Sequence, residues 1–594
     1  MKKLRQVFSI ALAVTMIAST VSCKQADTSP TVAKTSSGVV DYAKAKPETL
    51  TLFSQTANFT GTQGGWFGKL LKDKFNITLK IISGQGDGAN LYTTRSAAQD
   101  LGDIVIFGSN VQNFTDSIKA GLLMDLTPLL KTDGKYIQQN YSAALDRMKT
   151  TYGENKAIYG LPNNVSTEKA TTSSDGSDLT YGNYLLWSAY KAAGSPTIST
   201  LEDLLPALQK MQKAHPLADN GKPTYGFSLF KDWDGTMMSN AKQYTCMYGY
   251  DEWGFMLIYA DGSKSESILD KNGQYYRNLK LYHDANKLGL LDPDSYAQTQ
   301  SDFTTKLKNG QILSNWWQWC CQPQYNTVER TASTYSNPTT GVKGADGYAL
   351  IPMSDEKIIS NGFSPTGVNY EMAIGSKCSD PQRAMALINW LYSPEGEEAA
   401  KEGPKGMLWD VVNGKPALTD LGKKALNDNA STAIPSEWGG GTYQDGQDKL
   451  ADFKCVAENG DDPTLKEPYL YTGWSSYNSA PNDLVKEWSK TVGQGTSTSH
   501  TFLAKVNQMI VAPGTPIQEP VLSTDVSTEK NNVSQIIRKY SWNMVMTKND
   551  AEFDKFWEQM AAEAKSAGIE DVDKAYAAQW NILSDARKKA MSES

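Results

Sequence analysis

Histidine is scarce in this chain of 594 residues, which has only His215, His283 and His500. None belongs to an HExxH zinc motif, and no GxSxG turn presents a nucleophilic serine. A Ser-His-Asp triad therefore has no support. A glycosidase needs only two carboxylates, and the chain has 65 acidic residues, but no particular pair stands out. We expect no catalytic residue and no enzyme activity, with a surface glycoside hydrolase as the alternative.

Cysteine is also rare. Five cysteines follow Cys23, namely Cys246, Cys320, Cys321, Cys378 and Cys455. Their spacing matches no zinc site, and an odd number leaves at least one without a partner in the chain. A disulfide between the adjacent Cys320 and Cys321 would be strained. We expect free, mostly buried thiols, and no metal or other cofactor.

Basic patches and long apolar runs are missing from most of the chain. The net charge is −7 and the pI is about 5.4, so nucleic acid is not an expected partner. After the first 22 residues no apolar run reaches the length that spans a bilayer. We therefore expect contact with a membrane only through the N-terminal end.

Residues 1–22 have the pattern of an export signal. Lys2, Lys3 and Arg5 precede the apolar run Val7–Ile17. The string Thr20–Cys23 resembles a bacterial lipobox, although Thr20 stands where leucine is usual. Residues 23–47 are polar and predict a flexible tether that begins at a lipid-modified Cys23. The expected location is the extracytoplasmic face of the cell membrane. The alternative is an ordinary secretory signal in which Cys23 occurs by chance.

From residue 48 onward, strand and helix patterns alternate. Thr49–Phe53, Ile77–Ile82 and Asp103–Phe107 have the character of strands, and Trp66–Phe75 has helical spacing. This order predicts a layered α/β domain. Further along, Asp380 and Pro381 predict the start of a helix.

Five later stretches resemble one family in their order and spacing. They are Ala120–Leu129 (AGLLMDLTPL), Ala157–Pro162 (AIYGLP), Tyr184–Thr197, Ser379–Ser393 and Gly403–Lys415. Together they resemble the extracellular solute-binding lipoproteins of carbohydrate ABC importers, of the family 1 type. The likeness is greatest to the long oligosaccharide-binding branch of Gram-positive bacteria. It extends from about residue 48 to the C-terminus.

The resemblance implies an α/β, two-lobed periplasmic-binding-protein-like fold of type II. Its discontinuous lobes are joined by crossing strands, near Tyr159–Pro162 and Tyr348–Pro352, with a ligand cleft between them. The first lobe is expected to comprise residues 48–162 and about 353–425, and the second residues 163–352 and about 426–594. The resemblance further implies a monomer that closes like a hinge on an oligosaccharide. Its partners would be ABC permease subunits.

One departure from the resemblance bears on metal binding. Many members of that branch carry a loop resembling a calcium site where this chain has Leu217–Lys222. A single Asp and a single Asn cannot supply the six to eight oxygen ligands that calcium takes. We therefore expect no metal there.

The stretch SNWWQWCCQ, residues 314–322, places three indoles within four residues. Indoles cover the apolar face of a pyranose ring. If the stretch is a strand, Trp317 and Trp319 share one face and Trp316 takes the other. Trp317 best matches the stacking position of maltose-binding-type proteins, Trp319 comes second, and Trp316 is expected in the core. The alternative is that all three pack inside.

Further ligand-binding candidates combine an aromatic plate or an amide with a cleft position. Asp232 and Trp233 follow a strand-like segment, and an exposed turn is the alternative there. The remaining candidates are Gln55, Asn110, Gln112, Asn369 and Tyr370, with Trp409 and Trp474 as possible rim residues. Since a fold does not determine a ligand, a receptor for a peptide or another non-sugar solute stays open beside the oligosaccharide receptor.

Overall fold

The computed structural model describes residues 41–84, 89–108, 110–428, 431–449, 454–515, 520 and 522–593. The expected signal and Cys23 lie outside these residues. Within the described ranges, no helix is both long enough and apolar enough to cross a bilayer. Tyr42 is buried in a hydrophobic core and donates a hydrogen bond to Asp133 at 3.0 Å. The last residues of the expected tether are therefore packed against the fold.

The first lobe is built on a six-stranded sheet with the order β2-β3-β1-β4-β13-β5. Its strands are β1 (Glu48–Ser54), β2 (Gly61–Thr62), β3 (Ile77–Ser83), β4 (Ile104–Ile106), β5 (Leu161–Asn163) and β13 (Val368–Ile374). The strands β1, β3 and β4 are parallel, and β13 pairs antiparallel with β4 and β5. A strand from late in the chain is thus inserted between two early ones.

Helices flank this sheet. They are α1 (Gly65–Phe75), α2 (Ala89–Ala97), α3 (Val111–Lys119), α4 (Thr127–Thr132), α5 (Lys135–Asn140), α6 (Ser142–Tyr152), α13 (Pro381–Leu391) and α14 (Pro394–Glu402). The Asp380 side chain accepts a hydrogen bond from Arg383 N at 3.1 Å, so the predicted start of α13 is confirmed. Smaller elements complete the lobe: β14 (Trp409–Val412), β15 (Lys415–Leu418), α15 (Asp420–Gly422), α16 (Tyr443–Gly446) and α17 (Ser475–Asn478).

The second lobe contains a three-stranded antiparallel sheet with the order β10-β6-β11, and a separate sheet β7-β8-β9. These strands are β6 (Tyr181–Leu186), β7 (Tyr250–Trp253), β8 (Met256–Tyr259), β9 (Ser265–Ser267), β10 (Ser314–Trp317) and β11 (Tyr348–Leu350). The surrounding helices are α7 (Trp187–Ala192), α8 (Leu204–Ala214), α9 (Ser239–Gln243), α10 (Gln274–Lys287), α11 (Gln300–Lys308), α12 (Gln318–Tyr325), α18 (Asp483–Thr491) and α19 (Ser499–Lys505). Three long helices end the chain: α20 (Thr524–Met546), α21 (Asp550–Ser566) and α22 (Ile569–Ser592).

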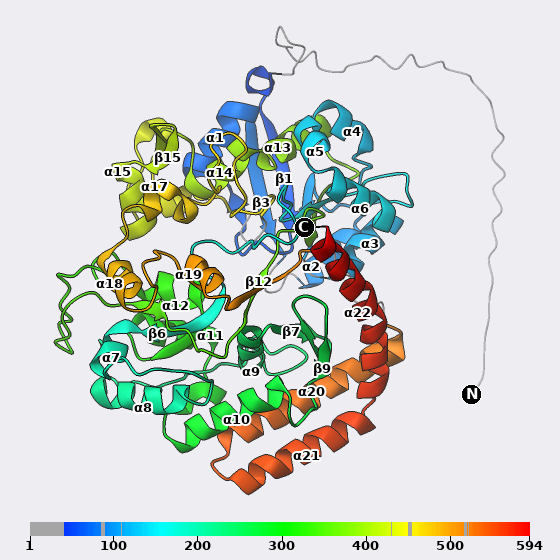
Figure 1. The fold of residues 1–594 in the computed structure, drawn as a ribbon. Coiled ribbons are helices and arrows are strands. Elements are labelled where there is room, and N and C mark those ends of the chain that lie inside the picture. Colours follow the sequence, from blue (N-terminus) through cyan, green and yellow to red (C-terminus); the bar gives the residue numbers. More distant parts are fainter. Residues whose placement is uncertain are drawn as a thin grey trace, which may run out of the picture.

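Two separate hydrophobic cores match these two lobes. Figure 1 shows them as two bodies, with β1, β3 and α13 in the upper one and β6, α10 and α21 in the lower one. Residues Tyr443, Cys455 and Tyr469 pack in the first core, although the sequence-based boundary assigns residues after about 425 to the second lobe. The chain also stays in the second core through Ile358, beyond the expected crossing near Tyr348–Pro352.

Two segments cross between the lobes, and a third segment of the first lobe pairs with the first of them. The first follows β5, the second runs from β12 (Ile358–Asn361) to β13, and the third includes Lys454–Asn459. Val165 forms bridges to both Ser364 and Val456, which ties the three segments together. A further strand, β16 (Met509–Ala512), pairs parallel with β12. We call these three segments the hinge.

Gly362 lies where the backbones of neighbouring hinge segments approach each other closely. A Cβ on Gly362 would lie 1.9 Å from the carbonyl oxygen of Ala170 and 2.8 Å from the amide nitrogen of Gly514. Only a residue without a side chain lets these segments approach so closely.

The five cysteines after Cys23 are all free, and all but Cys378 are buried. This confirms the expected state of the thiols. Cys320 and Cys321 lie in α12 and belong to the core of the second lobe.

Candidate functional site

Three tryptophans of the second lobe form one cluster. The ring centroids of Trp317 and Trp319 lie 5.0 Å apart, and that of Trp233 lies 5.6 and 6.0 Å from them. Trp233 and Trp319 are 43% and 44% exposed, whereas Trp317 is 7% exposed. We call these three residues the tryptophan platform. Two of its indoles are open to solvent, and Trp317 packs between them and the core.

The local backbone explains how the platform forms. The strand β10 ends at Trp317 and helix α12 begins at Gln318, so the expectation that Trp319 continues the strand is wrong. The first turn of α12 instead brings Trp319 back beside Trp317. Trp316 lies in the core against Tyr244 and Tyr282, as predicted. Because Trp317 is nearly buried, the open aromatic faces belong to Trp319 and Trp233.

The loop that carries Trp233 is held on both sides. Asp234 accepts hydrogen bonds from Trp542 Nε1 at 2.7 Å and from Ser239 N at 2.8 Å. The Trp233 ring also packs edge to face on Phe230, with centroids 5.0 Å apart. The expected hydroxyl acceptor Asp232 is exposed and accepts a hydrogen bond from Gln300 N at 2.8 Å. These contacts orient the indole before any ligand arrives.

Gln55, Asn110 and Gln112 lie where strands β1 and β4 end. Because these strands are parallel, the three residues share the carboxyl edge of the first sheet. Gln55 Oε1 accepts a hydrogen bond from Gly108 N at 2.9 Å. Asn110 caps α3 by accepting from Gln112 N, and the Gln112 amide donates to Asp116 at 2.6 Å. Asn110 and Gln112 are exposed, so their amides are open to a ligand.

Asn369 and Tyr370 lie in β13, next to an irregularity in its pairing with β5. The Asn369 side chain accepts a hydrogen bond from Arg147 at 2.7 Å, which assigns it a role inside the first lobe. Tyr370 has a φ of 76°, an unusual conformation for a residue with a side chain. Both are half-buried.

Trp409 and Trp474 are buried at 3% and 1% exposure, with ring centroids 5.6 Å apart. Their indole nitrogens donate to the carbonyls of Gly403 and Pro468. They therefore pack with each other inside the first lobe, and the expectation of rim residues is wrong.

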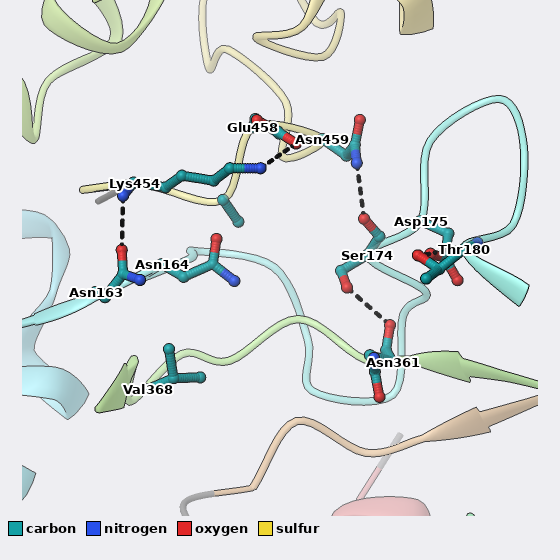
Figure 2. Close-up of a pocket in the computed structure, with 11 residues that line it drawn as sticks. Asn163, Asn164, Ser174, Asp175, Thr180, Asn361, Val368, Lys454, Glu458 and Asn459 are labelled. Carbon is teal, nitrogen blue, oxygen red and sulfur yellow. Dashed lines mark hydrogen bonds and ion pairs between the residues drawn. The ribbon is translucent and has the colours of Figure 1, made fainter. Parts of the chain in front are cut away.

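The sequence analysis missed a cavity on the hinge, drawn in Figure 2. Its volume is about 260 Å³, and all three hinge segments contribute to its wall. Lys454 donates to Glu458 at 2.5 Å, and Asn459 donates to Ser174 O at 2.9 Å. No local pattern could have found this cavity, because Lys454 lies 291 residues along the chain from its partner Asn163.

A half-buried ion pair of the second lobe was also missed. The ammonium of Lys242 lies 2.6 Å from the Asp251 carboxylate. Burial alone would lower the pKa of Lys242, but Asp251 raises it well above its usual range. Both groups lie close enough to Tyr181 to affect the pKa of its hydroxyl, and Tyr181 is in register with Trp317 in the sheet.

Two places could be mistaken for metal sites. In the loop Leu217–Lys222, the Asp219 carboxylate is paired with the Arg330 guanidinium, a cation supplied by the chain itself. His283, Asp284 and Asp550 also lie close together. There, however, the Lys287 ammonium lies 2.6 Å from Asp550. Ion pairs account for both groups of carboxylates.

The sequence model of the bacterial extracellular solute-binding protein family matches residues 58–398, more than half of the chain. No curated protein matches the chain by sequence. Proteins of this family and the similar solved structures are substrate-binding proteins, not enzymes. This family is extracellular, which agrees with the expected location outside the cytoplasm.

Three solved structures illustrate the similarity in fold. An HMO-binding, ABC-transporter-associated solute-binding protein from Bifidobacterium longum infantis has a TM-score of 0.53 and 15% identity, over 91% of this chain and 99% of that one. The alginate-binding protein AlgQ2 has a TM-score of 0.55 and 14% identity, over 91% and 100%. The S. pneumoniae ABC-transporter substrate-binding protein FusA, in complex with kestose, has a TM-score of 0.54 and 12% identity, over 92% and 100%.

The order of strands in the first sheet, the two cores and the crossing segments agree with the expected two-lobed α/β fold of type II, and these structures have the same fold. The family match covers every strand of the first lobe's sheet except β1, and all strands of the second lobe's two sheets β10-β6-β11 and β7-β8-β9. The chain belongs to the bacterial extracellular solute-binding protein family.

Proposed function

We propose that this chain is the receptor of a carbohydrate ABC importer, which captures an oligosaccharide between its two lobes and delivers it to permease subunits. The observation that carries the proposal is the tryptophan platform, in which Trp233 and Trp319 are both more than two-fifths exposed. Exposed indoles held by packing are suited to stack on the C–H faces of sugar rings.

The first lobe supplies the complementary chemistry. The exposed amides of Asn110 and Gln112 lie at the carboxyl edge of its sheet, where α/β folds bind ligands. Amides donate and accept hydrogen bonds, as sugar hydroxyls require. An oligosaccharide that contacts indoles on one lobe and amides on the other stabilises the closed arrangement, because both sets of contacts form only there.

The similar structures support the ligand class. Two of these proteins bind HMO and alginate, and the third was solved in complex with kestose; all three ligands are carbohydrates. For the whole protein we propose a monomer held at the membrane only by lipid on Cys23, facing outward. It has no nucleic acid partner, no cofactor and no catalytic role. The comparisons give no support to the alternative of a glycoside hydrolase.

The proposal is tested with the soluble chain from Lys24 onward. Kestose, maltotriose, xylotriose, cellotriose and lacto-N-tetraose are titrated while tryptophan fluorescence is recorded, and each sugar is then recovered by chromatography. Saturable binding with the sugar recovered intact is the expected result. A cleaved sugar would establish the hydrolase instead. If no sugar binds, the receptor takes another solute, and di- and tripeptides are tested next.

A further inference from the structure

The cavity on the hinge contains polar atoms that the fold does not use. Asn459 Oδ1 is buried and has no hydrogen-bond partner among the described residues. Asn164 and Asn361 also line the cavity. Their side-chain amides form no hydrogen bond with any residue that the structure describes. Figure 2 shows Asn164 on one side of the site and Asn459 and Asn361 on the other. Unused amides on the wall of a cavity favour a ligand that both donates and accepts hydrogen bonds.

The charges of the wall exclude an anionic occupant. Lys454, the one cation among the lining residues, is already paired with Glu458. Asp175 accepts hydrogen bonds from Thr180 Oγ1 at 2.7 Å and Ser360 Oγ at 2.6 Å, but no cation pairs with it in the described structure. The lining therefore carries one uncompensated negative charge, which repels carboxylate and sulfate groups.

Size and shape limit the occupant further. A volume of about 260 Å³ lies just below the range typical of drug-sized ligands, roughly 300–1,000 Å³. The wall also presents one apolar side chain, Val368, which is 39% exposed. A single ring with hydroxyl groups at its rim and C–H groups on its face fits this combination.

The cavity adjoins the tryptophan platform along the chain. The Thr180 carbonyl, which belongs to a lining residue, accepts a hydrogen bond from Gln318 N at 3.2 Å. Gln318 is the residue between Trp317 and Trp319. One backbone hydrogen bond, at the end of the paired strands β6 and β10, therefore joins the wall of the cavity to the platform.

From these observations we infer that the hinge cavity binds one neutral, polyhydroxylated sugar ring, the terminal residue of the oligosaccharide whose other rings lie on the platform. This inference rests on the proposed function. Because the wall includes residues of both crossing segments, a bound ring contacts the parts of the chain that join the two lobes. Occupation of the cavity thus favours the closed arrangement.

The test compares a trisaccharide from the panel that binds with its disaccharide, which lacks the terminal ring. Calorimetric titrations use the wild type, Asn361→Ala and Asn459→Ala, with Asn532→Ala on the exposed face of α20 as the matched control. Each cavity variant is expected to weaken the trisaccharide about threefold to tenfold, the loss of one hydrogen bond, and to leave the disaccharide unchanged. Trp319→Ala is expected to weaken both.

Two further arms identify the source of the ring and its charge. Free glucose, galactose and fructose are titrated at millimolar concentration. If a free sugar binds the wild type and Trp319→Ala but not Asn361→Ala, the cavity is assigned to a free sugar of the same chemistry. A trisaccharide ending in glucuronic acid is expected to bind the wild type at least tenfold more weakly than its neutral counterpart, and Asp175→Asn is expected to narrow that gap.

The outcomes separate the two proposals. Wild-type affinity for the trisaccharide in both cavity variants would overturn the cavity assignment and leave the receptor intact. Equal binding of the uronic and neutral trisaccharides would overturn the inferred neutrality of the ring. If no oligosaccharide binds, the proposed function is contradicted. If the free sugars do not bind either, the cavity proposal is contradicted as well.

Discussion

The two lobes present different chemistry to a ligand. The first has a mixed sheet in which the carboxyl ends of the parallel strands β1 and β4 are followed by the amides of Gln55, Asn110 and Gln112. In the second lobe, the short antiparallel strand β10 is followed directly by helix α12, and this change of direction brings the indoles of the platform together. The difference indicates a division of tasks: one lobe supplies flat apolar surface and the other supplies hydrogen bonds.

Removing the supporting indole should have the largest effect on the second lobe. Trp317 is 7% exposed and contacts Trp316, Trp233 and Trp319. Trp317→Ala is therefore expected to lower the free energy of unfolding by about 3–5 kcal/mol, since it leaves a cavity in the core. Urea unfolding measures this change.

Trp319→Ala is the matched control, because Trp319 belongs to the same cluster but is 44% exposed. It should cost less than about 1.5 kcal/mol of stability, as a partly exposed side chain does. Equal destabilisation by the two substitutions would contradict the distinction between a supporting and a contacting indole.

The hinge should be the most sensitive point between the lobes. Gly362→Ala places a methyl group 1.9 Å from the Ala170 carbonyl, so the crossing segments must separate. We expect a loss of about 3 kcal/mol in unfolding free energy, at the upper end for an overpacked site, together with weaker ligand binding. Thermal and urea unfolding report the first effect, and titration with the bound sugar reports the second.

Gly235→Ala provides the control for that substitution. Nothing lies within 4 Å of a Cβ at Gly235, and its φ is not in the positive range. Its stability should stay within about 0.5 kcal/mol of the wild type, as for surface changes in general. If Gly362→Ala has the stability and the ligand affinity of the wild type, the close packing of the hinge segments is contradicted.

The first lobe should be the pH-sensitive half. Burial raises the pKa of Glu371 in β13 to about 7, although Arg147 opposes the shift, and both of its carboxylate oxygens are buried without a hydrogen-bond partner. Between pH 4.5 and 7 the folded chain keeps a proton that the unfolded chain has released. Stability from this group is therefore present at low pH and is lost as the pH rises through 7.

Glu371→Gln removes this titration, so the fall in stability between pH 5 and pH 8 should become smaller by about 1–3 kcal/mol. Urea unfolding at pH 5, 6, 7 and 8 measures the slope, with the exposed Glu437→Gln as control. An unchanged slope in Glu371→Gln would mean that Glu371 is ionised in the folded protein at pH 5.

The smallest effect is expected at the edge of the first sheet. Gln112→Ala removes one exposed amide and should weaken binding of the sugar about twofold to fivefold, the value of one solvent-exposed hydrogen bond. Gln138→Ala, an exposed glutamine on α5, serves as the control. An affinity for Gln112→Ala equal to that of the control would remove Gln112 from the ligand site and narrow the first lobe's contribution.

Local patterns were sufficient for much of this account. Short apolar runs placed β1 and β4, and alternating apolar residues placed β3. Asp380 with Pro381 marked the start of α13, and the density of indoles in residues 314–322 indicated the platform. Each of these signals lies within a dozen residues, the range over which periodicity and capping act.

The remainder depends on distant pairings that no local pattern records. The hinge cavity joins Asn163 to Lys454, and the burial of Trp409 depends on Trp474. Trp319 was assigned to a strand, whereas it lies in α12. The residues after Trp317 are compatible with a strand or with the first turn of a helix, and only the tertiary fold distinguishes the two. Trp317 and Trp319 came together in either case, which is why the platform was found for a partly wrong reason.

The central claim is that the exposed indoles of the platform hold a sugar. The most direct test is a calorimetric titration of Trp319→Ala with a panel sugar that the wild type binds. The control is Tyr276→Ala, a half-buried ring on α10 that packs against Trp557 in the second lobe. The account predicts a loss of about tenfold or more in affinity for Trp319→Ala, since a stacked aromatic ring contributes about 0.5–1.5 kcal/mol beyond its buried area. The control should bind as the wild type does, and equal affinities of the two variants would contradict the account.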